Sequence, residues 1–514
     1  MRRWWVWPVA IGIGLVARAW LNTPPTPRHV VIISLDTTRA DALGPWRGPD
    51  AHTPAIDAFA AEAVTFDWHY SAAPTTLASH TTLMTGRWPQ SHGVPRNDYA
   101  VHEDNIFLAE RLRDEGWRTA AFLGAIPLAV HSGFPQGFDH VDEAFTLHRT
   151  SDDVAQTERR GAEVTAAALT WLDANPVADG ESLLLFVHYF DAHAPYTSGP
   201  EALAAHGLTE ADNAYGTLEA VMRLRRMLRG RDPKALALAG TMERLYRAGV
   251  TEADAAVGAL LAGLRERGVY DDAVILITAD HGETFATHDE VFDHGETVFD
   301  ETVHTPLIMR FPGGWSGGER ITERVTNPDV FPTLLALLGL DPPPDEGAGA
   351  IDGLSLLPLV RDDLLRGSRP PVFVEATKPH VKDKERWQNA GMRKAIVTDE
   401  GKLHLDPRKS SVALYDLSSD PGELTDLAPT QPDLTAALRA ELVAWTKSAH
   451  PLPSGRISSA RVKAELAALG YLEANEPVGD EAPGEAPSDA PDEADEDGAP
   501  AAPNPAPAAP GAPQ

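Results

Sequence analysis

The chain has 514 residues, a formal net charge of −31 and no cysteine. This length is enough for one large α/β catalytic domain with a small companion, and a hydrophobic content of 43% predicts a well-packed core. The negative charge argues against a nucleic-acid partner, because phosphate backbones need lysine and arginine for neutralisation. The absence of cysteine excludes disulfides and thiolate metal ligands but does not fix the compartment.

The N-terminal residues 1–21 indicate export. Two arginines precede an apolar run from Trp4 to Ala17, which is shorter than a membrane span of about 20 residues and typical of a signal peptide. The small residues Ala17 and Ala19 suit a cleavage site, whereas Trp20 and the early tryptophans equally suit an uncleaved helix anchored in the membrane. We therefore expect a secreted, periplasmic or membrane-anchored protein, with a linker at 22–28.

Residues 29–366 alternate between apolar runs and helical patterns. Strands are expected at 29–36, 117–124, 182–193, 273–280 and 304–313, and helices at 53–66, 105–117, 164–175, 251–268 and 327–340, with further helices within 200–250. Because strands that alternate with helices form a mostly parallel sheet with helices on both faces, this pattern predicts an α/β catalytic domain.

The pattern changes near residue 367. Short extended segments predict a small antiparallel sheet that is closed by a helix at 433–447, so a C-terminal subdomain is expected over 367–450. A connecting segment follows at 451–471. Residues 472–514 are rich in alanine, proline and acidic residues, and we expect a disordered tail because this composition buries too little apolar surface to offset the entropy of ordering.

Candidate metal ligands follow two of the apolar strands. Asp36 ends the run HVVIISLD, and Asp280 and His281 come directly after AVILITA. Ligands gather at the carboxyl ends of parallel strands, and carboxylates with an imidazole suit a hard or borderline divalent cation. An aspartate after a strand can also cap the next helix, and each residue taken alone is as well explained in that way.

A candidate nucleophile lies between them. Thr76 opens the stretch TLASHTTLMTG (76–86), which predicts a turn that leads into a helix. The free N–H groups and the dipole at a helix N-terminus can hold an anionic oxygen. Locally, a helix cap rich in serine and threonine explains the same residues.

Taken together, SLDTTRAD (34–41), TLASHTTLMTG (76–86) and ITADHGE (277–283) resemble the active-site segments of the sulfatase family in the alkaline phosphatase superfamily. LYDLSSDPGELTDLA (414–428) resembles the C-terminal signature of that family. The resemblance covers about 29–450 and implies an alkaline-phosphatase-like sandwich. It also implies one site for Zn, Mn, Ca or Mg, formed by Asp36, Thr76, Asp280 and His281, with Thr76 as both ligand and nucleophile.

Three departures from the sulfatases concern their substrate. Thr76 stands where sulfatases convert a cysteine or serine to formylglycine, and His80 stands where an arginine steadies that group. GAIPLA (124–129) replaces a segment with a substrate-binding lysine and histidine. We therefore expect no formylglycine and favour a phosphodiester or phosphonate monoester as substrate. Sulfate-ester hydrolysis without formylglycine, phosphoglycerol-type transfer and a catalytically dead binding protein remain open.

The stretch 76–97 also resembles nucleotide pyrophosphatases/phosphodiesterases. Their threonine nucleophile is followed by a histidine, as His80 follows here, and by an asparagine at the distance of Asn97 that stabilises the oxyanion. The resemblance implies that His80 and Asn97 contact substrate and that Asn97 has a catalytic part. As an alternative, Asn97 is a turn residue.

Two further histidines are expected at the site. In YFDAHAPY (189–196), Asp191 and His193 are two residues apart, as in sulfatases, whose histidine there contacts substrate. That spacing favours one metal over the two of the zinc phosphodiesterases, although a second stays open. His294 falls where sulfatases have a lysine that contacts the substrate oxyanion, so it could bind the oxyanion or protonate the leaving group; a surface histidine is the alternative. The substrate is expected to be a small-molecule, glycan or lipid ester, with specificity residues within 200–250 and 378–392.

Overall fold

The computed structural model describes residues 23–462, except for 146–157, 230–232, 289–290, 344–349, 362–366, 368, 378–388, 458 and 460–461. The expected signal peptide or anchor (1–21) and acidic tail (472–514) lie outside the described residues, and so does most of the 378–392 loop. Within the described part, no helix is both long and apolar enough to cross a membrane. The domain boundaries stay predictions.

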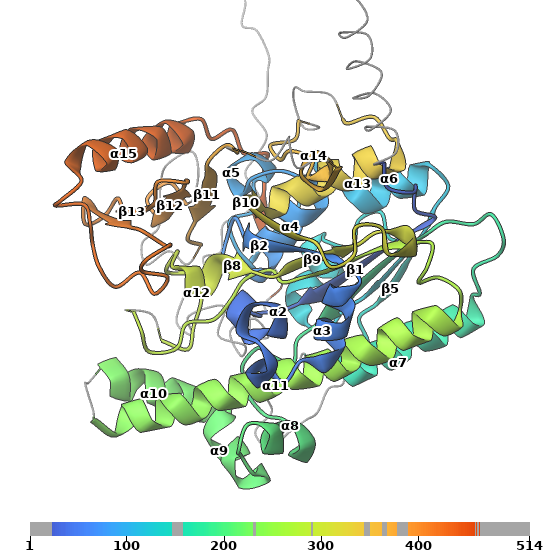
Figure 1. The fold of residues 1–514 in the computed structure, drawn as a ribbon, viewed down its shortest axis with the longest axis horizontal. Coiled ribbons are helices and arrows are strands. Elements are labelled where there is room, and N and C mark those ends of the chain that lie inside the picture. Colours follow the sequence, from blue (N-terminus) through green and yellow to red (C-terminus); the bar gives the residue numbers. More distant parts are fainter. Residues whose placement is uncertain are drawn as a thin grey trace, which may run out of the picture. The chain divides into compact units, whose positions relative to one another are not determined.

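The predicted α/β fold is confirmed. Over the described residues the central sheet has nine strands in the order β10-β2-β9-β7-β1-β6-β4-β5, with β8 paired to β2 (Figure 1). Their bounds are β1 (His29–Leu35), β2 (Val64–Tyr70), β4 (Arg118–Phe122), β5 (His140–Asp142), β6 (Leu183–Tyr189), β7 (Ala273–Thr278), β8 (His304–Thr305), β9 (Leu307–Arg310) and β10 (Arg320–Thr326). Strands β7, β1, β6, β4 and β5 are parallel, whereas β9 runs antiparallel to β7 and β2.

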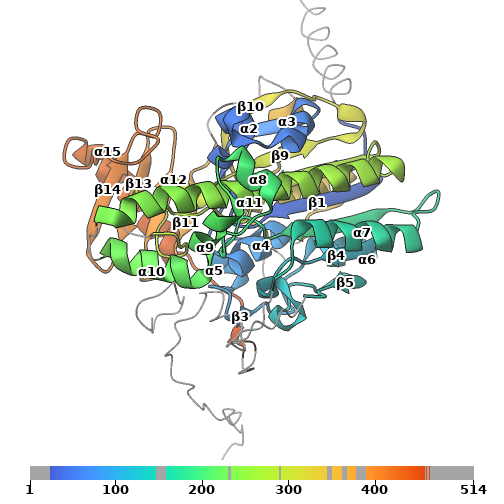
Figure 2. The same cartoon turned by 90° about the horizontal axis from the view of Figure 1, so that it is seen from below.

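Helices cover both faces of this sheet. One face packs against α3 (Pro54–Ala61), α7 (Gly161–Ala174) and α11 (Pro233–Glu266), and the other against α4 (Thr76–Thr85), α6 (Leu108–Asp114) and α13 (Val330–Leu338). Figure 2 shows α7 and α11 on the first face. Strand β1 explains the arrangement: all seven of its residues are buried, and Val31 and Ile33 enter one hydrophobic cluster while Val30 and Ile32 enter the other.

The predicted small antiparallel sheet is also present. It has the order β11 (Val372–Glu375), β12 (Lys394–Val397), β13 (Lys402–Asp406) and β14 (Ser411–Tyr415), and α15 (Pro432–Lys447) packs on it. The remaining α-helices and strands are α2 (Gly44–Arg47), α5 (Pro89–His92), α8 (Pro200–Ala205), α9 (Asn213–Gly216), α10 (Leu218–Arg229), α12 (Asp300–Val303), α14 (Leu357–Arg361), β3 (Tyr99–Ala100) and β15 (Gly455–Arg456).

Two predicted elements differ from the structure. The helix expected at 53–66 ends at Ala61, and residues 64–66 begin strand β2 instead. The helix expected at 251–268 is only the second half of α11, which starts at Pro233 and spans 34 residues. The first error arose because the apolar residues of a short helix and of the next strand together mimic one helical period.

Candidate active site

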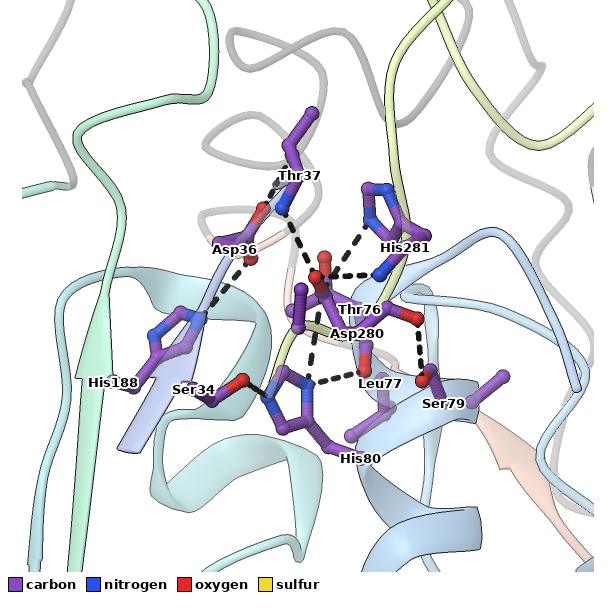
Figure 3. A network of polar contacts seen from close by, with 12 residues as sticks. Ser34, Asp36, Thr37, Thr76, Leu77, Ser79, His80, His188, Asp280 and His281 are labelled. Carbon is purple, nitrogen blue, oxygen red and sulfur yellow. Dashed lines mark hydrogen bonds and ion pairs between the residues drawn. The ribbon is translucent and has the colours of Figure 1, made fainter. Parts of the chain in front are cut away.

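The predicted metal ligands lie together at one edge of the sheet. Strands β1 and β7 are parallel neighbours, so Asp36 and Asp280, which follow them, emerge side by side (Figure 3). Ligand atoms of Asp36, Asp280 and His281 all lie within 4.8 Å of one another, and all three side chains are buried. A buried cluster of two carboxylates and one imidazole needs a compensating cation.

Asp280 and His281 each present a buried atom without a hydrogen bond among the described residues, and these two atoms lie 3.4 Å apart. The Asp280 Oδ1 atom accepts hydrogen bonds from the backbone N–H groups of Thr37 (3.0 Å) and His281 (2.8 Å), whereas Oδ2 has no hydrogen-bond partner. The His281 Nδ1–H donates to the carbonyl of Gly282 at 2.9 Å, and Nε2 is buried without a hydrogen bond among the described residues. Burial and the nearby Asp36 raise the pKa of Asp280. These atoms have the character of metal ligands and fit the predicted divalent cation.

Asp36 is held from two sides. Its Oδ1 accepts the hydroxyl of Thr37 at 2.6 Å, and its Oδ2 lies 3.1 Å from Nε2 of His188, a residue of strand β6. Burial lowers the pKa of His188 to about 4, so the ring is neutral at neutral pH and Nε2–H is the donor to the carboxylate. Thr37 adopts a left-handed backbone conformation with φ 59°, which turns its N–H toward Asp280.

Thr76 is the first residue of α4 and is fully buried. Its carbonyl oxygen lies 2.8 Å from Nδ1 of His80, and the same Nδ1 lies 3.8 Å from Oδ2 of Asp280 (Figure 3). The N-terminus of α4 is therefore adjacent to the metal-ligand cluster. The hydroxyl of Ser79 in the next turn donates to the carbonyl of Asp280 at 2.7 Å, which ties the helix to the strand end.

Both ring nitrogens of His80 contact protein atoms. Nδ1–H donates to the Thr76 carbonyl, so Nε2 accepts the hydroxyl of Ser34 at 2.7 Å. Burial lowers the pKa of His80 to about 4, which is consistent with this neutral tautomer. The geometry favours a role in positioning α4, and the expected substrate contact of His80 stays a prediction.

Asn97 lies at the N-terminus of the same helix. Its Oδ1 accepts the backbone N–H of Leu77 at 2.8 Å, while its buried Nδ2 has no hydrogen-bond partner among the described residues. The side chain thus fixes one free N–H group of the helix and retains two donors for another acceptor.

His193 and His294 continue the cluster on one side. The rings of His281 and His294 lie 4.2 Å apart between centroids, and those of His294 and His193 lie 5.3 Å apart. Burial lowers the pKa of His193 to about 4, and its Nδ1–H donates to the Ala194 carbonyl at 2.6 Å. The structure thus brings both predicted histidines beside His281; their roles toward substrate stay predictions.

Asp191, the nearest acidic residue to His193 in the sequence, contacts the start of α7. Its carboxylate accepts the backbone N–H of Gly161 at the start of α7, at 3.0 and 2.9 Å. This aspartate serves a helix terminus. The number of metal ions stays a prediction.

Several residues of the site were not predicted. His188 contacts Asp36, Asn327 donates to Ser79 and accepts the N–H of Ala72, and the hydroxyl of Tyr246 on α11 donates to the carbonyl of Thr37 at 3.0 Å. The one signal in the sequence was a histidine inside the apolar run LLLFVHY, which is also compatible with a satisfied core residue.

Comparisons with known proteins match most of the chain to one family model. The sulfatase model matches residues 28–340, and a model described as N-sulphoglucosamine sulphohydrolase, C-terminal, matches residues 288–448. Among curated proteins, the chain is 26% identical over 360 residues to the ulvan-active sulfatase of Formosa agariphila. That match covers 66% of this chain and 66% of the relative, so the chain spans about two thirds of that protein's length.

Solved structures share the fold. A protein in complex with its substrate D-glucosamine-2-N,6-O-disulfate superposes with a TM-score of 0.65 at 18% identity, over 82% of this chain and 98% of that one. The phosphonate monoester hydrolase of Agrobacterium radiobacter superposes with a TM-score of 0.59 at 20% identity, over 82% of this chain and 95% of that one. At such identities the likeness shows the fold alone.

Proposed function

Because the chain belongs to the sulfatase family, we propose that it is a metal-dependent ester hydrolase in which Thr76 is the nucleophile and the substrate is a phosphodiester or phosphonate monoester. The observation that carries the proposal is the buried cluster of Asp36, Asp280 and His281 beside the N-terminus of α4. Such a cluster is costly without a ligand that pairs with it.

Asp36, Asp280 and His281 would hold the cation, with the Thr76 hydroxyl as the fourth protein ligand. A divalent ion there would lower the pKa of the hydroxyl, polarise the ester oxygen and orient the substrate. The unsatisfied Oδ2 of Asp280 and Nε2 of His281 support this assignment, because the hydrogen bonds made by their other atoms fix both groups in ligand geometry.

The protein residues then have distinct parts in the reaction. The Thr76 hydroxyl gives its proton to solvent, and its oxygen forms a bond to phosphorus as the bond from phosphorus to the leaving oxygen breaks. The leaving alkoxide takes up a proton, with His294 as the proposed donor. Water then attacks phosphorus as the bond to Thr76 breaks; one water proton returns to His294, and the Thr76 oxygen takes up a proton from solvent, which restores the hydroxyl. The free N–H groups of α4 and Nδ2 of Asn97 would stabilise the charge that develops on the phosphoryl oxygens.

The choice of phosphorus rests on the residues that differ from the sulfatases. Thr76 replaces the precursor of formylglycine, and His80 is engaged with Ser34 and the helix backbone instead of a hydrated aldehyde. The phosphonate monoester hydrolases among the structural neighbours show that this fold serves such substrates. Sulfate-ester hydrolysis is the second candidate, favoured by the names of the curated relatives.

A side-by-side assay tests the proposal. An aryl sulfate, an aryl phosphate, an aryl phosphodiester and an aryl phosphonate monoester are incubated with the protein and with Thr76→Ala. Thr81→Ala is the matched control, because the Thr81 hydroxyl of the same helix bonds only to the Leu77 carbonyl among the hydrogen bonds described. We expect diester or phosphonate turnover to exceed sulfate turnover, and Thr76→Ala to lose both. Faster sulfate turnover overturns the substrate class, and an active Thr76→Ala overturns the nucleophile.

Metal analysis separates the enzyme from a dead scaffold. The protein is stripped with a chelator and then titrated separately with Zn²⁺, Mn²⁺, Ca²⁺ and Mg²⁺. One tightly bound ion per chain and recovery of turnover are expected. Failure to bind any of the four favours a binding protein that keeps only the fold.

A further inference from the structure

A cleft opens beside His193. It is lined by Glu158, Arg159, Arg160, Phe190, Asp191 and His193, with Glu163, Pro195 and Thr197. Its volume is about 130 Å³. Since a cavity needs roughly 10–15 Å³ to hold one water, there is room for on the order of ten non-hydrogen atoms, the size of a small polyol or one sugar ring.

The cleft borders the proposed active site at His193, which lines the cleft and contacts His294. The ring of His193 stacks on Phe190 at 4.2 Å between centroids, and its neighbour His294 stands next to the proposed ligand His281. A group bound in the cleft therefore lies next to the reacting ester, where part of the substrate must be.

Most polar side chains of the cleft are already occupied by the protein. Arg159 pairs with Asp142 at 2.8 Å and donates to the carbonyl of Leu123. Arg160 contacts the hydroxyl of Thr197 at 2.5 Å and the carboxylate of Glu252 at 3.5 Å. These groups shape the cleft but have little capacity left for a ligand.

Glu158, unlike the two arginines, keeps an atom that can accept a hydrogen bond from a ligand. It enters the cleft from a short backbone bridge to Ala125, and its Oε2 is buried without a hydrogen-bond partner among the described residues. Burial raises the pKa of this carboxyl to about 7, as expected for an acid that has lost water without gaining a donor. An unsatisfied buried acceptor is costly, so a ligand that donates to it is strongly preferred over one that cannot.

We propose that this cleft is the subsite for the leaving group of the ester, and that Glu158 recognises a hydroxyl group there, as a polyol or sugar presents it. The assignment rests on the proposed function for the place of the reacting bond. It selects for neutral, hydroxyl-bearing leaving groups, because the carboxylates of Glu158 and the neighbouring Asp191 would repel a second anion.

The test uses esters that share one phosphorus group and differ in the leaving alcohol. Methylphosphonate monoesters of phenol, glycerol, glucose and choline, or the matching series of the ester class that the protein turns over best, are compared in the wild type, Glu158→Ala and Glu158→Gln. Glu110→Gln is the matched control, because Glu110 lies outside the cleft and its carboxylate likewise accepts a backbone N–H at a helix start, that of Phe107 before α6.

We expect Glu158→Ala to lower kcat/KM for the glycerol and glucose esters by roughly 10- to 100-fold, with the phenyl ester changed less than twofold and Glu110→Gln like the wild type. Glu158→Gln, which keeps the volume, is expected to lose less. Equal loss for all esters, or no loss, overturns the proposal. Selective loss of the choline ester overturns the hydroxyl assignment in favour of a cation.

A binding measurement makes the inference independent of turnover. Saturation-transfer NMR with free glucose or glycerol is expected to detect binding to the wild type and a clear loss in Glu158→Ala. If Thr76→Ala remains active but the Glu158 effects hold, the nucleophile is wrong and the subsite stands. If binding of the polyols is the same in both proteins, the subsite is wrong whatever the reaction is.

Discussion

Replacing His188 should weaken metal binding although the residue is not itself a proposed ligand. The imidazole donates from Nε2 to Oδ2 of Asp36 over 3.1 Å, and Thr37 holds the other oxygen. Groups that orient a metal ligand in this way typically contribute 10- to 100-fold to metal affinity. That range corresponds to about 1.4–2.7 kcal/mol and agrees with the value of a hydrogen bond to a charged group.

The experiment is a calorimetric titration of the chelator-stripped protein with Mn²⁺. His188→Leu is expected to raise the dissociation constant by roughly 10- to 100-fold, whereas His188→Gln, whose amide can replace Nε2–H as a donor, should recover much of the affinity. His69→Leu is the control, because His69 is an equally buried imidazole of the central sheet that contacts Thr305 instead of Asp36. The reasoning fails if folded His188→Leu binds Mn²⁺ as tightly as the wild type.

Three other outcomes follow from particular contacts. Asn97→Asp keeps the acceptor for the α4 backbone but loses both amide donors, so kcat should fall by roughly 10²-fold or more; steady-state kinetics with an unchanged kcat would exclude the oxyanion role. Lys402→Met leaves the carboxylates of Asp300 (2.6 Å) and Glu423 (3.0 Å) without their buried cation, and urea titration should show a loss of about 3–5 kcal/mol; a loss within 0.5 kcal/mol, as for a typical surface change, would contradict this. Burial lowers the pKa of His69 to about 3, so its contribution to stability is present above the unfolded pKa of about 6.5 and is lost as the pH falls toward 3. Because of this one residue, the free energy of unfolding should be about 2 kcal/mol lower at pH 5 than at pH 7. In His69→Leu this difference should be smaller, which urea titrations at the two pH values would show.

The parts of the fold that could be predicted were those in which the spacing of apolar residues fits only one kind of element. Buried parallel strands give continuous apolar runs, so β1, β6 and β7 and the polar residues at their ends were identified directly. Strand β2 was missed because VTFDWHY follows a short helix without a turn signal and mixes both periods. The start of α11 was missed although Pro233 at its first position is a start signal, because the helices expected within 200–250 were given no bounds.

The site residues could be predicted only where they stand next to a recognisable strand or helix in the sequence. Asp36 and Asp280 each come after a recognisable buried strand, so their convergence followed from the parallel sheet. The place of Thr76 beside them was implied only by the resemblance to sulfatases, because strand β2 before it was missed. The contact between His188 and Asp36 depends on the register that pairs Ser34 with His188 across β1 and β6. No local pattern encodes that register. The cleft at Glu158 was likewise outside the regions expected to set specificity, because it is formed by a bridge to Ala125 that only the tertiary structure reveals.

The pairing of β1 with β7 also has a consequence for how the protein acquires its ion. Thr37 and Asp280 are 243 positions apart in the sequence yet share a hydrogen bond at the rim of the sheet. A chain that has not yet joined these two strands offers the cation only scattered carboxylates, so strong uptake has to wait until the middle of the sheet is assembled. Metal binding would then stabilise the domain only after the central sheet has formed. Removal of the ion should therefore lower the melting temperature as well as the rate of turnover.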